Sequence, residues 1–259
     1  MSDESIVNEA MTISDKAQEA GLSLKILGAG AIRIHCSNFT SLHKAMERTL
    51  TDIDFVTPKK QKKDVFKFME TLGYRMDRHM RYVMTISNRY ILTKPGWDIH
   101  IDIFLDKLDM CHLIDLRSRI HLDHPTIPLA DLLLEKTQIV QINEKDIKDV
   151  IVLLREHNIG DGDVETINTQ YIADLLSKDW GFYYTVTTNL KKTEEYLQKY
   201  DVLTEDDVLD VKAKINTLLD MIEQNTKSRR WKMRAKVGTK KKWYKDVEDV
   251  YEREELHSR

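Results

Sequence analysis

Three aspartates stand at spacings that could bring them together to do chemistry. Asp52 and Asp54 lie in TDIDFV, and Asp102 lies in HIDIF. Residues two apart on a strand point to the same side, so Asp52 and Asp54 present two carboxylates on one face. A neighbouring strand with Asp102 would add a third, and such like charges repel unless a cation lies among them. Oxygen ligands of this kind suit Mg²⁺, and two Mg²⁺ ions held by shared carboxylates support phosphoryl or nucleotidyl transfer.

A pair of glycines supplies the complementary feature. The short apolar strand LKIL runs directly into Gly28, Ala29 and Gly30, and AIRIHC then reads as the start of a helix. Without side chains in the way, the backbone N–H groups at a helix start can approach a phosphate. The glycines also fit a simple tight turn.

The order of these motifs resembles the nucleotidyltransferase (DNA polymerase β-like) superfamily, over roughly residues 24–157. A glycine motif is followed by D-x-D on a strand and by a single Asp on a later strand. The branch that it resembles is that of the minimal and AbiE-toxin-like bacterial nucleotidyltransferases, which also includes antibiotic-modifying adenylyltransferases. The resemblance implies that Asp52, Asp54 and Asp102 are catalytic and hold the metals. It implies that the glycine segment contacts the nucleotide phosphates.

A later stretch extends the resemblance. Glu135-Lys136, followed by KDIKD over 145–149, is similar to a helical E-K…(K/R)-D-x-x-D segment of AbiE-like members. Lys136 would then be a nucleotide-binding cation on the phosphate side, although a solvated helix residue fits equally.

Two features depart from the pattern. Ala29 stands where a second Gly or Ser is usual, and residues 37–50 form an insertion that could be a substrate-facing loop.

Other interpretations of the same residues remain open. Asp52 and Asp54 could be exposed positions on an edge strand, and Asp98 competes with Asp102 for the third carboxylate. The adjacent pairs His35-Cys36 and Cys111-His112 invite a zinc site. Neighbouring side chains diverge, however, and neither pair has ligand spacing, so buried structural cysteines are favoured.

The C-terminal run 227–245 is basic, contains no acid and carries interleaved aromatic residues. This composition suits a contact to single-stranded RNA, a tail that packs its aromatic residues on the domain, or a segment that folds over the active site. The acids that follow, from Asp246 to Glu255, suggest a helix that pairs with it. The candidate RNA contacts are Lys227, Arg229, Arg230, Trp231, Lys240, Lys241 and Lys242.

The elements that must position these residues follow from hydrophobic periodicity. Strands are expected at 24–27, 52–56, within 74–93 around a Ser87-Asn88 turn, and at 97–105. Helices are expected before residue 21 and over 59–72, and only helices after Pro128. We therefore predict an α/β (α+β) fold, with a nucleotidyltransferase-like mixed sheet and flanking helices, followed by an all-helical C-terminal domain. The predicted parts are a catalytic domain (1–127), a helical domain (128–225) and a basic then acidic segment (226–259).

The composition of the chain excludes several classes of protein. Hydrophobic residues make up 41% of 259 residues, with 9 Gly and 4 Pro, which excludes wholesale disorder and collagen-like chains. The net charge of −3 excludes a protein that is basic as a whole. Two cysteines, an acidic N-terminus and short apolar runs predict a cytoplasmic protein without a signal peptide or membrane partner.

These observations converge on one predicted activity. We expect a Mg²⁺-dependent enzyme with two metal ions that transfers a nucleoside monophosphate from an NTP, foremost ATP, to a hydroxyl. The acceptor could be a small molecule, an RNA or a protein. The alternative is a catalytically inactive protein of the same fold that binds nucleotide or RNA.

Overall fold

The computed structural model describes residues 2–76 and 88–247. The strands are β1 (Lys25–Leu27), β2 (Asp52–Thr57), β3 (Arg75–Met76), β4 (Arg89–Thr93), β5 (His100–Leu105), β6 (Lys107–Asp109), β7 (Leu113–Asp115), β8 (Asn158–Gly160) and β9 (Thr166–Asn168). The helices are α1 (Asp3–Glu19), α2 (Gly28–His35), α3 (Thr40–Ala45), α4 (Lys62–Thr71), α6 (Leu129–Thr137), α7 (Glu144–Glu156), α8 (Thr169–Leu176), α9 (Trp180–Tyr196), α10 (Glu205–Gln224) and α11 (Arg229–Val237).

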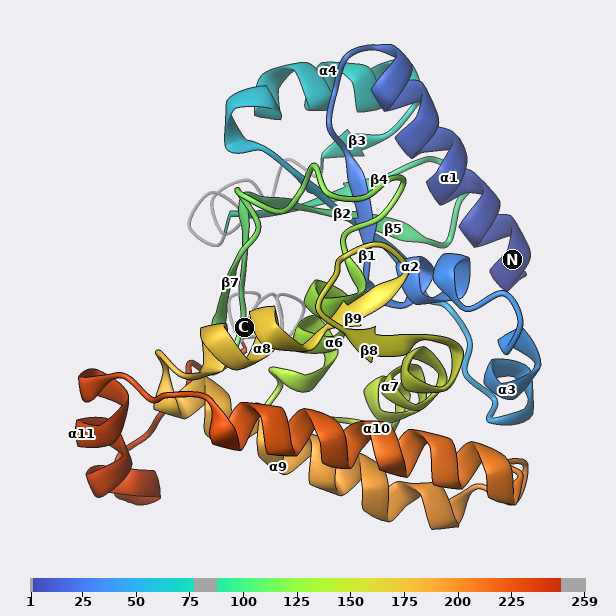
Figure 1. Cartoon of the computed structure of the whole chain (residues 1–259). Coiled ribbons are helices and arrows are strands. Elements are labelled where there is room, and N and C mark those ends of the chain that lie inside the picture. Colours follow the sequence, from blue (N-terminus) through green and yellow to red (C-terminus); the bar gives the residue numbers. More distant parts are fainter. Residues whose placement is uncertain (1, 77–87, 248–259) are drawn as a thin grey trace, which may run out of the picture.

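The main sheet has five strands in the order β1-β2-β5-β4-β3 (Figure 1). β2 and β5 run parallel, and the other neighbours run antiparallel. The alternation in DIDFVT buries Ile53 and Phe55 on one face and leaves the two aspartates on the other. The sequence predicted a mixed sheet with flanking helices followed by an all-helical C-terminal domain. The structure confirms the mixed sheet, the flanking helices and a C-terminal part made mostly of helices.

The chain returns to the sheet before it enters the helical part. The N–H of Ile26 donates to the carbonyl oxygen of Pro125 at 2.9 Å, and the N–H of Ile127 donates back to Ile26 at 3.2 Å. This pairing satisfies backbone groups on the outer edge of β1, which would otherwise stay open. The same pairing brings the start of α6 next to α2. α2 follows β1 directly, and only Pro128 separates Ile127 from α6.

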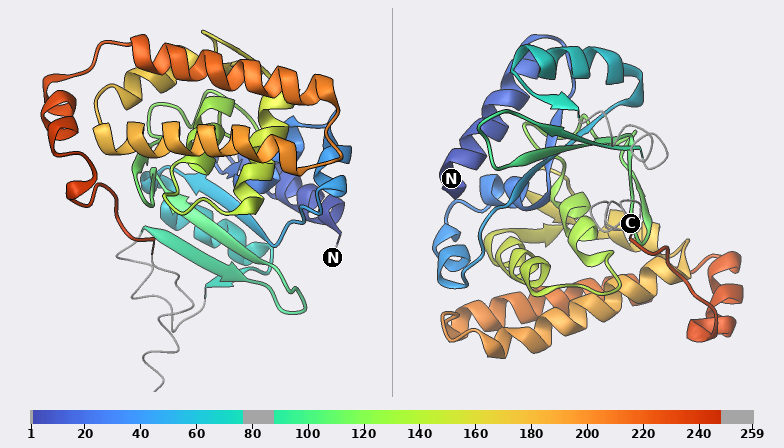
Figure 2. Two further views of the ribbon diagram at one scale, coloured as in Figure 1. Left: turned by 90° about the horizontal axis from the view of Figure 1, so that it is seen from below. Right: turned by 180° about the vertical axis from the view of Figure 1, so that it is seen from behind.

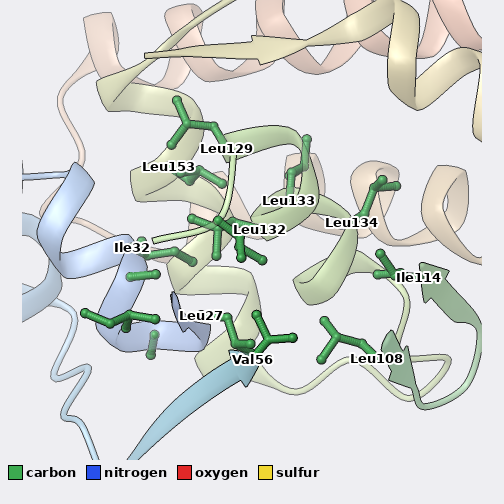
Figure 3. Packing of buried hydrophobic residues seen from close by; sticks show 14 of the residues in the cluster. Leu27, Ile32, Val56, Leu108, Ile114, Leu129, Leu132, Leu133, Leu134 and Leu153 are labelled. Atoms are coloured by element: carbon green, nitrogen blue, oxygen red, sulfur yellow. The ribbon is translucent and has the colours of Figure 1, made fainter. Parts of the chain in front are cut away.

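Buried apolar side chains from the sheet and the helices form one continuous core (Figure 3). Leu27, Ile32 and Val56 come from β1, α2 and β2, and Leu132 and Leu153 come from α6 and α7. Each of these five side chains is at most 1% exposed. Every residue of α6 is buried, including Asp131, Glu135 and Lys136, because other elements enclose this helix.

An outer layer of two long helices covers this core. α9 and α10 lie side by side (Figure 2) and contact α6 and α7. α10 begins with a capping box, in which Thr204 and Asp207 each accept a hydrogen bond from the other's backbone N–H. α11 lies at one end of this layer and contacts α9.

Some details differ from the sequence-based expectations. The prediction of helices alone after Pro128 is wrong, because β8 and β9 form a short parallel pair. The predicted strand 97–105 begins only at His100, and the insertion 37–50 contains α3. Ser87 of the predicted turn and the acids beyond Val247 lie outside the described residues.

Over the described parts of the chain, no helix is both long and apolar enough to cross a bilayer. α2 contacts β1 and β2 as well as α6 and α7. The division at residues 127 and 225 into separate domains stays a prediction.

Candidate active site at the start of α2

The sheet brings the three predicted aspartates to one place. In the parallel pair, Asp54 on β2 stands opposite Asp102 on β5, and Asp52 stands opposite His100. Asp102 is buried, whereas Asp52 and Asp54 are half-buried. Asp98, the competing candidate, lies exposed before β5 begins. The central strands therefore position Asp102, and not Asp98, next to Asp54.

Gly28 places the start of α2 directly against the carboxylate of Asp54. Leu27, the last residue of β1, pairs with Asp54, and α2 begins at the next residue. Gly28 has φ +71°, and a Cβ atom there would lie 2.3 Å from Oδ2 of Asp54. Only glycine suits both the backbone conformation and the contact. At Gly30 a Cβ would meet only Ile26, at an ordinary 3.7 Å.

Negative charge is concentrated around Asp54. Burial first, and then the carboxylates of Asp52, Asp102 and Glu135, raise the pKa of Asp54 well above its usual range. Lys136 opposes this effect but is the weakest of these influences. A group that is costly to ionise in the protein alone becomes favourable to ionise once a cation is added.

Arg89 on β4 completes the site on the other side of Asp102. Its Nη2 lies 2.6 Å from Oδ2 of Asp102, and Nε2 of His100 lies 3.8 Å from the same oxygen. The other oxygen, Oδ1, is buried and accepts no hydrogen bond from the described part of the chain. One oxygen of Asp102 is thus fixed by a guanidinium, while the second remains for a ligand.

The carboxylate of Glu135 on α6 accepts a hydrogen bond from the first backbone N–H of α2. The N–H of Gly28 donates to its Oε2 at 3.0 Å. Burial raises the pKa of Glu135 to about 7, although neighbouring Lys136 and the Gly28 N–H oppose the shift. A carboxylate therefore sits where the positive end of α2 favours an anion.

Lys136 points toward acids of α7. Its Nζ lies 3.2 Å from Asp146 and 3.2 Å from Asp149. Burial alone would lower the pKa of Lys136, but Asp149, Asp146 and Glu135 raise it above its usual value. The E-K and D-x-x-D segments thus meet each other in a buried ion pair. That Lys136 contacts a phosphate stays a prediction.

The insertion 37–50 contributes a second cation to this buried network. Nε and Nη2 of Arg48 lie 3.0 and 2.9 Å from the two oxygens of Asp149. His43 on α3 is fully buried, with Nε2 3.7 Å from Asp149. The insertion is therefore anchored to α7 by charge, and these two side chains are interior.

The aspartate group fits Mg²⁺ in the chemistry of its donors. All three ligands offer oxygen, Asp102 keeps one buried oxygen without a hydrogen bond, and Asp54 lies among like charges. The ligand oxygens of the three aspartates do not all lie within 4.8 Å of one another. Within the described ranges, the ligand atoms of one trio of metal-binding side chains lie within 4.8 Å of one another, and that trio is His35, His157 and Glu165.

A basic, aromatic cavity of about 630 Å³ lies away from the aspartates, between the segment 111–113, the start of α9 and α11. Trp180, Trp231 and Trp243 line it together with several cations. Among the predicted RNA contacts, Arg230, Trp231 and Lys242 line this cavity. Lys227 instead donates to the carbonyl oxygens of Glu223 and Asn225 at 3.1 and 3.0 Å.

Sequence reasoning missed Arg89, Arg48 and the role of Glu135. Glu135 was noted only as the neighbour of Lys136, and its run of leucines gave no sign that it faces Gly28. Arg89 opens the strand RYILT, and a cation at the end of a strand is not distinctive by itself. The contact of Arg89 with Asp102 follows from the antiparallel pairing of β4 with β5, which the sequence does not give.

No protein-family model and no curated protein sequence matches this chain. Among solved structures, it is similar to the solution structure of the antibiotic-resistance factor ANT(2'')-Ia, with a TM-score of 0.40 and 15% identity. That match covers 58% of this chain and 83% of the other. A likeness this weak assigns no activity, which has to come from the chain's own residues.

Proposed function

We propose that this protein is a Mg²⁺-dependent nucleotidyltransferase that moves a nucleoside monophosphate from an NTP to a hydroxyl group. One observation carries the proposal: Asp54 and Asp102 stand opposite each other on adjacent strands, where Gly28 brings the start of α2 against Asp54. Acidic oxygens for a divalent ion and backbone donors for a phosphate thus share one place. Phosphoryl and nucleotidyl transfer use both.

Asp52, Asp54 and Asp102 would hold Mg²⁺ through their oxygens. A bound Mg²⁺ would lower the pKa of the attacking hydroxyl and neutralise charge on the α-phosphoryl group and on the pyrophosphate that this hydroxyl displaces. Arg89 fixes one oxygen of Asp102 and so orients its other oxygen toward the site.

The first turn of α2 would bind the phosphates. The backbone N–H groups of Gly28, Ala29 and Gly30 lie at the positive end of the helix. Since the Gly28 N–H donates to Glu135, an incoming phosphate has to share or displace that carboxylate. The raised pKa of Glu135 fits a group that gives up its negative charge readily.

Calorimetric titration of each NTP, with and without Mg²⁺, tests the donor site. We expect one nucleotide, ATP first, to bind only with Mg²⁺, and the binding to weaken at least tenfold in Asp54→Asn. Asp98→Asn is the matched control, because Asp98 is an exposed carboxylate that precedes the same strand. Full binding by Asp54→Asn, or no binding of any NTP to the wild type, would refute the proposal.

A second candidate function is binding of single-stranded RNA at the basic, aromatic cavity, with or without catalysis. Half-buried Trp231, Trp243 and Tyr244 offer ring surface to bases, and Arg230, Lys242 and Lys245 offer charge for phosphates. Trp180 is stacked on Tyr184 and meets Trp243 edge-on at 6.4 Å, which fixes the orientation of the Trp243 ring.

Binding of a fluorescent oligouridylate at several salt concentrations tests this surface. We expect affinity to fall steeply with salt, and Arg230→Gln to reduce the slope of log K against log salt by about 1. Lys16→Gln on α1 is the matched control and should leave the slope unchanged. Salt-independent binding, or equal slopes in both variants, would contradict RNA binding here.

A further inference from the structure

Three side chains that could hold a metal meet at the far end of α2. His35 is the last residue of α2, His157 follows α7, and Glu165 precedes β9. Nδ1 of His35 lies 3.3 Å from one carboxylate oxygen of Glu165, and Nδ1 of His157 lies 3.5 Å from the other. Both imidazoles are mostly buried, at 7% and 6% side-chain exposure, whereas Glu165 is 63% exposed.

The hydrogen bonds around His35 decide which of its ring nitrogens carries the proton. The hydroxyl of Thr126 donates its one proton to Asp123 at 2.6 Å. The same hydroxyl oxygen lies 2.6 Å from Nε2 of His35, and Asp123 lies 3.1 Å from that nitrogen. Nε2 is therefore the donor, and in the neutral ring Nδ1 presents a lone pair toward Glu165. Two acceptors that face each other at 3.3 Å require a cation or a second proton between them.

His157 reaches the same carboxylate from the side of α7. The rings of His35 and His157 meet edge-on, with centroids 5.8 Å apart. Nε2 of His157 is buried and has no hydrogen-bond partner in the described part of the chain, so the ring is held on its Nδ1 side, at Glu165. A single metal ion would engage both rings and the carboxylate, whereas one proton can bridge only one ring and Glu165.

The helices favour a cation at this position as well. α2 and α7 both end here, and the C-terminus of a helix carries partial negative charge. The position is separate from the aspartates, because α2 runs from Gly28 to His35, a rise of roughly 10 Å.

We propose that His35, His157 and Glu165 form a second metal site, which takes Zn²⁺. Two imidazoles and a carboxylate suit this borderline ion and differ from the all-oxygen group at the aspartates. One ligand atom from each of the three side chains lies within 4.8 Å of the others. The histidine nitrogens lie 3.3 and 3.5 Å from different oxygens of Glu165, so a small contraction of the group would reach the ligand–ligand edge of roughly 3.3 Å in a tetrahedron with bonds near 2.0–2.1 Å. Asp123 then acts as the outer carboxylate that orients His35.

The ion would hold the segment between β8 and β9 against the ends of α2 and α7. This segment includes an exposed run over 161–165, with Glu165 at φ +46°. The exposed side of Glu165 leaves a path for the ion to enter and a place for a water as fourth ligand.

Calorimetric titration of Zn²⁺ into the full chain, stripped of metal and kept in excess Mg²⁺, tests the site. We expect one Zn²⁺ per chain. Glu165→Gln should weaken binding at least a hundredfold, and Asp123→Asn should weaken it by roughly 10- to 100-fold. Asp161→Asn is the matched control, since Asp161 is an exposed acid of the same segment. It should bind like the wild type.

A second measurement separates this site from the aspartates. Co²⁺ in place of Zn²⁺ should give visible absorption of a four- or five-coordinate ion, unchanged in Asp54→Asn and lost in His157→Gln. Loss of the ion in Asp54→Asn, equal affinity in wild type and Glu165→Gln, or binding of Fe²⁺ without Zn²⁺ would each overturn the proposal.

Discussion

At the scale of single residues, Gly28 combines two constraints that normally occur apart. Its φ of +71° suits glycine, and its Cα faces the carboxylate of Asp54 so closely that a methyl group would lie 2.3 Å from Oδ2. Gly30, two residues later, has neither constraint, because a methyl group there makes ordinary contact with Ile26. The two glycines look alike in the sequence and differ only in what the fold requires of them.

Substitution of each glycine by alanine separates these requirements. Gly28→Ala should lower the free energy of unfolding by about 2 kcal/mol, since it adds left-handed strain and a clash with Asp54. Gly30→Ala should leave stability unchanged or raise it by up to about 1 kcal/mol, because alanine favours the helix. Urea unfolding followed by circular dichroism measures both. Equal effects of the two substitutions would show that the close approach at Gly28 is not a constraint.

At the scale of elements, local patterns predicted what the central strands carry. The period of two in DIDFVT and HIDIF placed Asp52, Asp54 and Asp102 on strands, and the parallel pairing brought two of them opposite each other. Patterns of this kind could not predict β8 and β9, which have three residues each and no alternation to detect. They also could not pair His35 with His157, because ligand spacing relates residues that are close in the chain, whereas these two histidines are far apart in the sequence and meet only in the fold.

The packing of α6, α7 and the insertion 37–50 depends on one buried anion. Asp149 contacts Arg48 through both oxygens and Lys136 at 3.2 Å, with a side-chain exposure of 2%. Burial of two cations is tolerated only while their counter-charge is present. Asp146 also contacts Lys136 at 3.2 Å, but its side chain is more exposed, at 15%.

Removal of the charge at Asp149 should therefore destabilise the protein strongly. Asp149→Asn keeps the shape but leaves Arg48 buried without its anion and Lys136 with Asp146 alone, which should cost about 3 kcal/mol or more. Asp146→Asn, its neighbour on the same helix, should cost only roughly 1 kcal/mol. Urea midpoints at pH 7 compare the two. A loss at Asp149 no greater than that at Asp146 would mean that the network contributes little to stability.

At the scale of the whole molecule, the C-terminal segment packs back against the turn between β6 and β7 and against α9. The indole N–H of Trp243 donates to Thr185 Oγ1 on α9 at 3.1 Å, and the backbone N–H of Lys245 donates to Cys111 at 3.1 Å. His112 lies between these contacts, with Nε2 2.8 Å from the same Thr185 oxygen and its ring stacked on Phe182. The basic run therefore packs its aromatic residues against the protein, as one of the sequence interpretations expected.

This closure should make the stability of the protein depend on pH. Burial lowers the pKa of His112 to about 4, and the carboxylate of Asp179 offsets this only in part. In the unfolded chain the pKa is near 6.5, so between these values the unfolded state binds the proton and the folded state does not. The contribution of His112 to stability is nearly complete above pH 6.5 and falls by about 2 kcal/mol at pH 5. The raised pKa of Glu135 acts in the opposite sense over this interval, so urea unfolding at pH 7 and pH 5 isolates the contribution of His112 as the difference between the wild type and His112→Gln. His121→Gln, which alters an exposed histidine, should follow the wild type. His112→Gln should lose about 2 kcal/mol less over the same interval. An unchanged pH dependence in His112→Gln would assign the effect to other groups.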